Sequence, residues 1–164
     1  MKKLILIRHA KSSWDNPWQN DHDRPLAERG LRDAPIMAKR LKKRGIHPDK
    51  ILSSSALRAM ETAKITAQEF NFPEDKIECE KNLFHASPNM ILKYIHLQKD
   101  SHDTLFVVGH NPGMNELINE LGIELDNLPT SGHIGFKLDA KSWSELNRKT
   151  VQFWFIDYPK KKED

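Results

Sequence analysis

The sequence contains little cysteine and no long apolar run. Among its 164 residues Cys79 is the single cysteine, so no intramolecular disulfide can form, and this favours a reducing compartment. No stretch approaches the roughly 20 consecutive apolar residues of a membrane-spanning helix. The apolar run near Met1 meets Arg8 before it is long enough for a signal peptide. We therefore expect a cytoplasmic protein that does not act on a membrane.

The chain also lacks a strong excess of charge of one sign. Its formal net charge is +3, and part of this comes from three consecutive lysines at 160–162. Elsewhere basic and acidic residues are mixed, which argues against nucleic acid as a partner. The eight histidines include no H-E-x-x-H motif and no paired Cys/His spacing. We expect no metal and no cofactor.

The length and the pattern of apolar residues predict one domain, residues 1–158, followed by a charged tail, 159–164. Apolar runs predict parallel strands over 2–7, 50–53 and 103–108, and a short strand near 76–78. Helical patterns follow, over about 27–44, 56–70, 88–97 and 112–121. Strands that alternate with helices are typical of a three-layer α/β/α fold with a mostly parallel central sheet.

Other parts of the pattern refine this expectation. Two later runs, 132–138 and 151–158, predict strands that add an antiparallel edge. Pro35 should either kink the first helix or mark its true start, with Asp33 as the cap. Residues 11–25 show no periodicity, and long irregular segments of this kind are usually functional or mobile.

Polar side chains follow the predicted strands at the points where those strands end. Arg8 and His9 follow the first strand, serines 53–55 and Arg58 follow the second, and His110 follows the third. Because the carboxyl ends of parallel strands meet at one sheet edge, these side chains can converge there. Arginine presents a planar fork of donors that suits phosphate oxygens, and helix N-termini add backbone N–H groups. The sequence therefore predicts an anion pocket, with Pro112 as the first residue of the last helix.

Each of these residues also has a structural explanation. Arg58 could be a surface arginine, His110 a buried histidine with a hydrogen bond, and serines 53–55 a helix N-cap region. Together, at corresponding strand ends, these separate explanations become improbable.

Three motifs resemble the histidine phosphatase (phosphoglycerate mutase-like) superfamily and occur in the order of that family. They are Arg8-His9-Ala10, Ser54-x-x-x-Arg58-x-x-x-Thr62-Ala63 and Gly109-His110-Asn111-Pro112. Ala10 replaces a more common glycine. The short length and Asp23-Arg24-Pro25-Leu26-x-x-x-Gly30 resemble the SixA-like branch, whose namesake removes phosphate from phosphohistidine in a signalling protein.

The resemblance implies a phosphoglycerate mutase-like fold and assigns roles to individual residues. His9 would be the nucleophile that forms a covalent phosphohistidine, and Arg8, Arg58 and His110 would hold the phosphoryl oxygens. Further candidates for substrate binding are Ser12, Asp15, Arg24 and Asn111. The family places a carboxylic acid as proton donor to the leaving group, and Glu80 is the candidate here.

The lack of a clearly placed acid bears on the substrate. An alkoxide leaving group needs a placed acid, whereas an imidazole nitrogen with a pKa of about 6.5 is much easier to protonate. We therefore expect a phosphatase whose substrate is phosphohistidine in a protein. We also expect a monomer. The alternatives are a phosphatase of small phosphate esters on the same scaffold, a mutase, a non-catalytic phospho-ligand binding module and a metal hydrolase.

Overall fold

A computed structural model describes residues 1–162, so the last two residues of the expected tail, 159–164, lie outside the described residues. Within this range the chain forms one six-stranded sheet in the order β3-β2-β4-β1-β5-β6. Strands β1 to β4 are parallel to one another, and β5 runs antiparallel to both β1 and β6. This confirms the mostly parallel sheet with an antiparallel edge. The strands are β1 (Lys2–Arg8), β2 (Lys50–Ser54), β3 (Glu78–Glu80), β4 (Thr104–Gly109), β5 (His133–Leu138) and β6 (Val151–Asp157).

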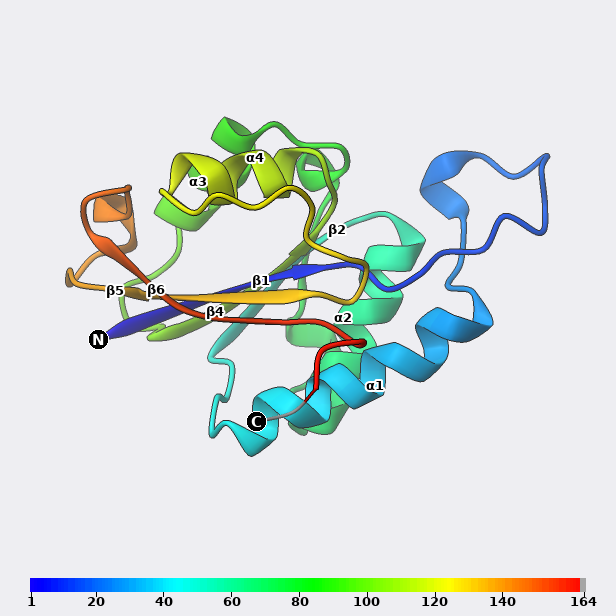
Figure 1. Cartoon of the computed structure of the whole chain (residues 1–164), viewed down its shortest axis with the longest axis horizontal. Helices are drawn as coiled ribbons and strands as arrows, with labels where there is room; N and C mark the ends of the chain where they lie inside the picture. Colours follow the sequence, from blue (N-terminus) through cyan, green and yellow to red (C-terminus); the bar gives the residue numbers. More distant parts are fainter. Residues whose placement is uncertain (163–164) are drawn as a thin grey trace.

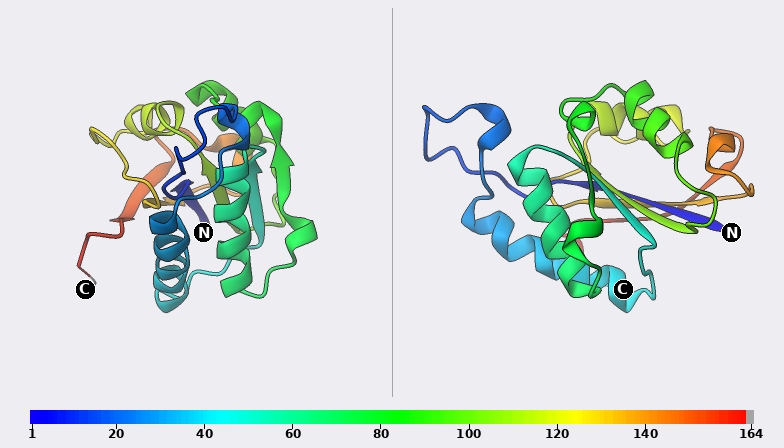
Figure 2. Two further views of the ribbon diagram at one scale, coloured as in Figure 1. Left: turned by 90° about the vertical axis from the view of Figure 1, so that its right-hand side faces the viewer. Right: turned by 180° about the vertical axis from the view of Figure 1, so that it is seen from behind.

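Four α-helices cover the two faces of the sheet. Helices α1 and α2 lie on one face and α3 and α4 on the other, as the opposite views in Figures 1 and 2 show. The predicted three-layer α/β/α architecture is thus confirmed. The helices are α1 (Glu28–Lys43), α2 (Leu57–Glu69), α3 (Pro88–His96) and α4 (Gly113–Glu120).

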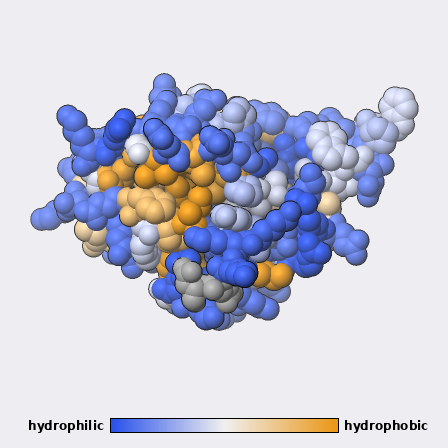
Figure 3. Space-filling model, viewed as in Figure 1, coloured by the Kyte–Doolittle hydropathy of each residue, from blue (hydrophilic) through white to orange (hydrophobic). Residues whose placement is uncertain are grey.

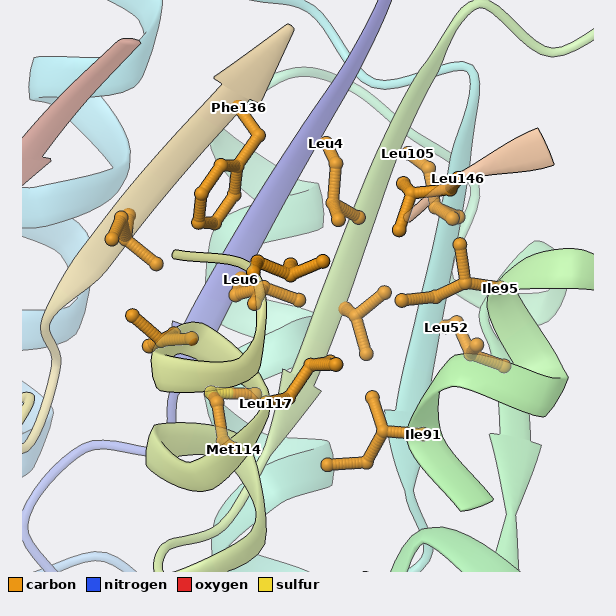
Figure 4. Close-up of a cluster of buried hydrophobic side chains, with 14 of the residues drawn as sticks. Leu4, Leu6, Leu52, Ile91, Ile95, Leu105, Met114, Leu117, Phe136 and Leu146 are labelled. Atoms are coloured by element: carbon orange, nitrogen blue, oxygen red, sulfur yellow. The ribbon is translucent and has the colours of Figure 1, made fainter. Parts of the chain in front are cut away.

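Strand β1 contributes side chains to both hydrophobic cores, because successive side chains of a strand point to opposite faces of the sheet. Leu4 and Leu6 join the cluster beneath α3 and α4, which Figure 4 shows in close-up. Ile5 and Ile7 join the cluster beneath α1 and α2. All four side chains are fully buried, and each contributes about 1.5–3 kcal/mol by burial. The apolar run thus fixes β1 at the centre of the sheet.

The structure corrects two boundaries. Helix α1 begins at Glu28 with Ala27 as its N-cap and continues through Pro35, so Pro35 does not mark the start and Asp33 is not the cap. The buried stripe of Ala34, Met37, Ala38 and Leu41 holds the helix together despite the one N–H that proline lacks. Strand β3 lies at Glu78–Glu80 rather than near 76–78, because residues Glu74–Lys76 form a 3-10 turn.

The carboxyl ends of the parallel strands lie beside the segment 11–25, which protrudes at one end of the molecule (Figure 1). This segment contains the 3-10 turn η1 (Asp21–Asp23), and Ser12 forms an isolated bridge with Leu26. In Figure 3 it is hydrophilic to neutral, whereas apolar side chains gather where β5 and β6 lie. Within residues 1–162, no helix has both the length and the apolar character to span a membrane.

Candidate active site

A cavity of about 310 Å³ lies at the carboxyl ends of the parallel strands. It brings together seven of the nine site residues that the sequence predicted, and it excludes Glu80 and Asp15. Its lining comprises Arg8, His9, Lys11, Ser12, Trp14, Asp21, Arg24, Arg58, His85, His110, Asn111 and Thr130. Three arginines and a lysine against one carboxylate give this lining, as described for residues 1–162, a net positive charge.

His9 is held so that one ring nitrogen is available for attack. Its Nδ1 lies 2.7 Å from the carbonyl oxygen of Ala10. A carbonyl oxygen can only accept a hydrogen bond, so Nδ1 carries the ring proton and Nε2 keeps its lone pair. Burial, opposed by the Ala10 hydrogen bond and assisted by the charges of Arg58 and Arg8, lowers the pKa of His9 to about 4. The ring is therefore neutral near pH 7, with an unprotonated Nε2.

A short chain of hydrogen bonds ties the turn after β1 to helix α2. The backbone N–H of Ala10 donates to Thr62 Oγ1 at 3.0 Å, and Thr62 Oγ1 donates to the carbonyl oxygen of Arg58 at 2.8 Å. On the other side Gly30 packs directly against the Lys11 backbone, where a Cβ atom would collide with the carbonyl oxygen. The spacing from Arg58 to Thr62 and the glycine at position 30 thus position the segment that carries His9.

Two arginines present donors to the cavity from opposite sides. Arg8 Nη1 donates to the carbonyl oxygen of Leu128 at 2.9 Å. Arg58, almost completely buried, donates through Nη1 to the carbonyl oxygen of Asp21 and through Nη2 to its carboxylate. Within residues 1–162 the Nε atoms of both arginines are buried without a hydrogen-bond partner. Both side chains line the cavity, and their charge and planar forks of donors suit an anion there.

His110 supplies a third buried donor. Its ring lies 5.1 Å from that of His9, centroid to centroid, and its Nε2 lies 2.8 Å from Ser54 Oγ. When the Ser54 hydroxyl, which also accepts the N–H of Ala56, donates to His110 Nε2, that ring nitrogen carries no proton. The proton of the neutral ring then resides on Nδ1, which has no partner within the described residues. Burial and the neighbouring charges of His9 and Arg58 lower the pKa of His110 to about 2.

The serines and the proline of the two later motifs act differently from the prediction. Ala56, not a serine, is the N-cap of α2, and no side chain caps that helix. Serines 53–55 instead line the strand end, where Ser54 orients His110. Pro112 is the N-cap of α4 rather than its first residue. Side chains next to both N-caps still accept backbone N–H groups: Ser54 Oγ accepts the N–H of Ala56, and Asn111 Oδ1 accepts the N–H of Asn115.

Asp21 and His85 are lining residues that the sequence analysis missed. Asp21 lies 2.7 Å from His85 Nε2, 3.0 Å from Arg24 Nε and 3.1 Å from Arg58 Nη2. Burial raises the pKa of the Asp21 carboxyl, but the hydrogen bonds from His85, Arg24 and Arg58 outweigh it and pull the pKa far below its usual value. Asp21 is thus a fixed anion. Neither residue lies in a periodic segment or a strand end, so no sequence signal marked them.

Arg24 and Ser12 form the wall contributed by the segment 11–25. Arg24 Nη1 donates to Ser12 Oγ at 2.8 Å, and both side chains are buried. The Trp14 ring stacks on the Arg24 guanidinium at 3.6 Å. Asn111 closes the opposite side by donating to the carbonyl oxygen of Leu128. These four residues shape the cavity around the arginines and histidines.

Glu80 and Asp15 do not reach this cavity. Glu80 lines a separate hollow with Glu78 and Tyr94, because residues two apart on a strand share one face and this face of β3 lies towards α3. Burial raises the pKa of Glu80, and the neighbouring Glu78 raises it further. Asp15 is exposed in the protruding segment, where its backbone N–H donates to Ser13 Oγ. The structure therefore does not bring either residue into the lining of the cavity.

Replacement of Glu80 by glutamine tests whether Glu80 acts from outside the cavity. Because the side chain lies outside the cavity, Glu80→Gln should leave kcat/KM unchanged for phosphohistidine and for phosphate esters alike. Asp21→Asn, a matched change of a carboxylate that lines the cavity, should lower the rate. A loss of ester hydrolysis in Glu80→Gln alone would return Glu80 to the site.

A resident metal has no evident ligand set in this part of the chain. Within residues 1–162, no group of three or more histidine, cysteine, aspartate or glutamate side chains is arranged to hold a metal ion.

Comparison with known proteins agrees with this geometry. The family model of the histidine phosphatase superfamily (branch 1) matches residues 4–83. An uncharacterized chloroplastic protein of Arabidopsis thaliana is 34% identical over 155 residues, which cover 88% of this chain and 70% of that protein.

Two solved structures are similar over almost their whole length. A crystal structure from Agrobacterium tumefaciens assigned as the phosphohistidine phosphatase SixA has a TM-score of 0.82 and 27% identity, covering 96% of this chain and 98% of that one. The protein histidine phosphatase SixA complexed with tungstate has a TM-score of 0.80 and 22% identity, covering 96% and 97%. The resemblance inferred from the three motifs is thereby confirmed.

Proposed function

Because the chain belongs to the histidine phosphatase superfamily and is SixA-like, we propose that this phosphatase dephosphorylates phosphohistidine in a protein through a covalent intermediate on His9. One observation carries the proposal. Within residues 1–162, a neutral histidine with an unprotonated Nε2 shares a positively charged cavity with three residues that carry a buried nitrogen without a partner, Arg8, Arg58 and His110. This arrangement suits a phosphoryl group that is attacked by one histidine and held by its neighbours.

In the first step His9 Nε2 forms a bond to phosphorus while the bond from phosphorus to the leaving nitrogen breaks. The electron pair of that bond stays on the leaving imidazole. The N–H donors of Arg8, Arg58 and His110 stabilise the negative charge on the phosphoryl oxygens, and these donors are in place before the reaction. The Ala10 carbonyl stabilises the positive charge that develops on the His9 ring, since it already accepts the Nδ1 proton.

In the second step a water molecule attacks phosphorus and the bond to His9 Nε2 breaks. The water loses a proton, inorganic phosphate is released and His9 returns to its neutral form. The same donors hold the phosphoryl oxygens in both steps, because the group stays in one place. Covalent catalysis in this form replaces one difficult displacement with two easier ones.

The proposed preference for phosphohistidine rests on the acids that the cavity offers. Asp21 is the carboxylate of the lining described within residues 1–162, and its ion pairs with Arg24 and Arg58 keep it ionised. An ionised carboxylate cannot protonate the alkoxide of an ester. An imidazole can leave without a proton being added to the nitrogen that departs from phosphorus. A substrate with a phosphorus–nitrogen bond therefore suits this cavity better than an ester.

A substrate panel tests the proposal. We expect kcat/KM for a phosphohistidine protein to exceed that for phosphoserine, phosphotyrosine and sugar phosphates, and activated aryl phosphates to react slowly but measurably. The phenolate of an activated aryl ester leaves with little proton assistance, whereas an alkoxide does not. Comparable rates for phosphohistidine and alkyl esters would contradict the preference and favour a phosphatase of small esters.

A further inference from the structure

His85 stands at the mouth of the cavity and is not needed to hold the phosphoryl group in the steps above. It lines the cavity while about half of its side chain remains exposed. Its ring lies 5.4 Å from that of His110 and 4.1 Å from that of Phe84, centroid to centroid. It therefore lies next to the phosphoryl-binding residues but faces whatever the phosphoryl group is attached to.

The backbone and a carboxylate both fix His85 in this position. Its φ is 51°, in the left-handed region that residues other than glycine rarely adopt. Backbone strain of this kind clusters at functional sites, because the surroundings must enforce it. Its Nε2 lies 2.7 Å from Asp21 Oδ2, a carboxylate that Arg24 and Arg58 hold in place. A carboxylate bonded to one ring nitrogen fixes the tautomer and the orientation of the ring.

We infer that His85 is the proton donor to the imidazole leaving group and acts on the ring nitrogen that is not bonded to phosphorus. This inference rests on the proposed function. Asp21 occupies Nε2 of His85, so Nδ1 is the nitrogen that transfers its proton. The proton moves to the distal nitrogen of the substrate ring as the phosphorus–nitrogen bond breaks. The leaving group departs as neutral imidazole. His85 remains as the neutral tautomer whose Nε2–H donates a hydrogen bond to Asp21.

The location of His85 suits this substrate better than an ester. The leaving oxygen of an ester is bonded directly to phosphorus and, in an in-line displacement, lies across phosphorus from His9 Nε2. The distal nitrogen of a phosphorylated imidazole is two bonds farther from phosphorus, towards the mouth. The half-exposed His85 beside the opening is therefore placed to reach the distal nitrogen of a phosphorylated imidazole. A histidine donor also matches the acidity of the imidazole that receives its proton.

Two small substrates separate this role from a structural one. N-Phosphoimidazole needs a proton on its distal nitrogen, whereas N-phospho-N′-methylimidazolium carries a permanent positive charge there and needs none. At about pH 7, His85→Ala should lower kcat/KM for phosphoimidazole by about 10²- to 10⁴-fold. It should leave kcat/KM for the methylated compound unchanged, which also shows that the variant is folded.

A conservative variant and a distant control complete the experiment. His85→Gln keeps an amide for Asp21 but has no proton to give up, so it should lose as much activity towards phosphoimidazole as His85→Ala. His47→Ala, which removes an exposed histidine before β2, should behave as the unmodified protein. Equal losses on both substrates, no loss on either, or recovery by glutamine would overturn the inference. Failure of the unmodified protein on a phosphohistidine protein as well as on both phosphoimidazoles would instead contradict the proposed function.

Discussion

Replacement of His9 by alanine is expected to abolish turnover and the phosphoenzyme together. His9 offers an unprotonated Nε2 in a buried, positively charged cavity, because Nδ1 is committed to the carbonyl oxygen of Ala10. Loss of a nucleophile typically lowers kcat on the order of 10⁴- to 10⁶-fold. The measurement is steady-state turnover of a phosphohistidine protein, together with acid-labile phosphate retained on the enzyme after a rapid quench.

His110→Ala is the matched comparison for this experiment. It removes a donor to the phosphoryl oxygens and leaves His9 in place, so turnover should fall while some phosphoenzyme still forms. If His9→Ala kept near-normal activity and His110→Ala lost the phosphoenzyme, the roles of the two histidines would be reversed. Thermal unfolding of both variants verifies that each is folded.

Arg58→Ala should produce the second large effect. The residue is almost completely buried and has an unpartnered Nε within the described residues, while Asp21 holds its other nitrogens. Loss of one preorganised donor to a transition state typically costs on the order of 10² to 10³ in rate. The same variant should bind inorganic phosphate more weakly, which isothermal titration can measure.

Two further variants define what Arg58 contributes. Arg58→Lys keeps the charge without the planar fork of donors, so it should recover only part of the lost rate. Arg32→Ala removes an exposed arginine that pairs with the neighbouring Asp33, and it should leave the rate unchanged. A full rate in Arg58→Ala would show that this guanidinium does not contact the phosphoryl group.

The sequence predicted the layers of the fold because each element has a strong periodic signal. The run that forms β1 alternates between two buried faces, and the helices carry apolar stripes towards the sheet. The places where prediction failed are those where packing outweighs a local rule. Helix α1 continues through Pro35 because its buried stripe spans the whole element.

The sequence likewise predicted some residues of the candidate site and not others. Arg8, His9, Arg58 and His110 were predictable because they follow strands whose carboxyl ends must meet. Glu80 lies outside the cavity, and the sequence did not predict this because the face on which a short edge strand directs its side chains depends on register, which composition does not reveal.

Asp21 and His85 show the limit of reading from sequence. Both lie in irregular segments, 64 residues apart, and only the folded chain brings their side chains within 2.7 Å. The pairing depends on the turn η1 and on the left-handed backbone of His85, and neither feature has a periodic signature. A site assembled from such segments has to be found in the structure.

The central claim is that phosphate passes from a phosphohistidine protein to His9 and then to water. The most direct measurement is a rapid quench with a substrate protein carrying radioactive phosphohistidine, followed by mapping of the labelled peptide. The account predicts transient label that is stable to alkali, labile to acid and confined to the peptide containing His9, with phosphate released as the label decays. Full turnover without labelled enzyme, or label confined to His110, would contradict it.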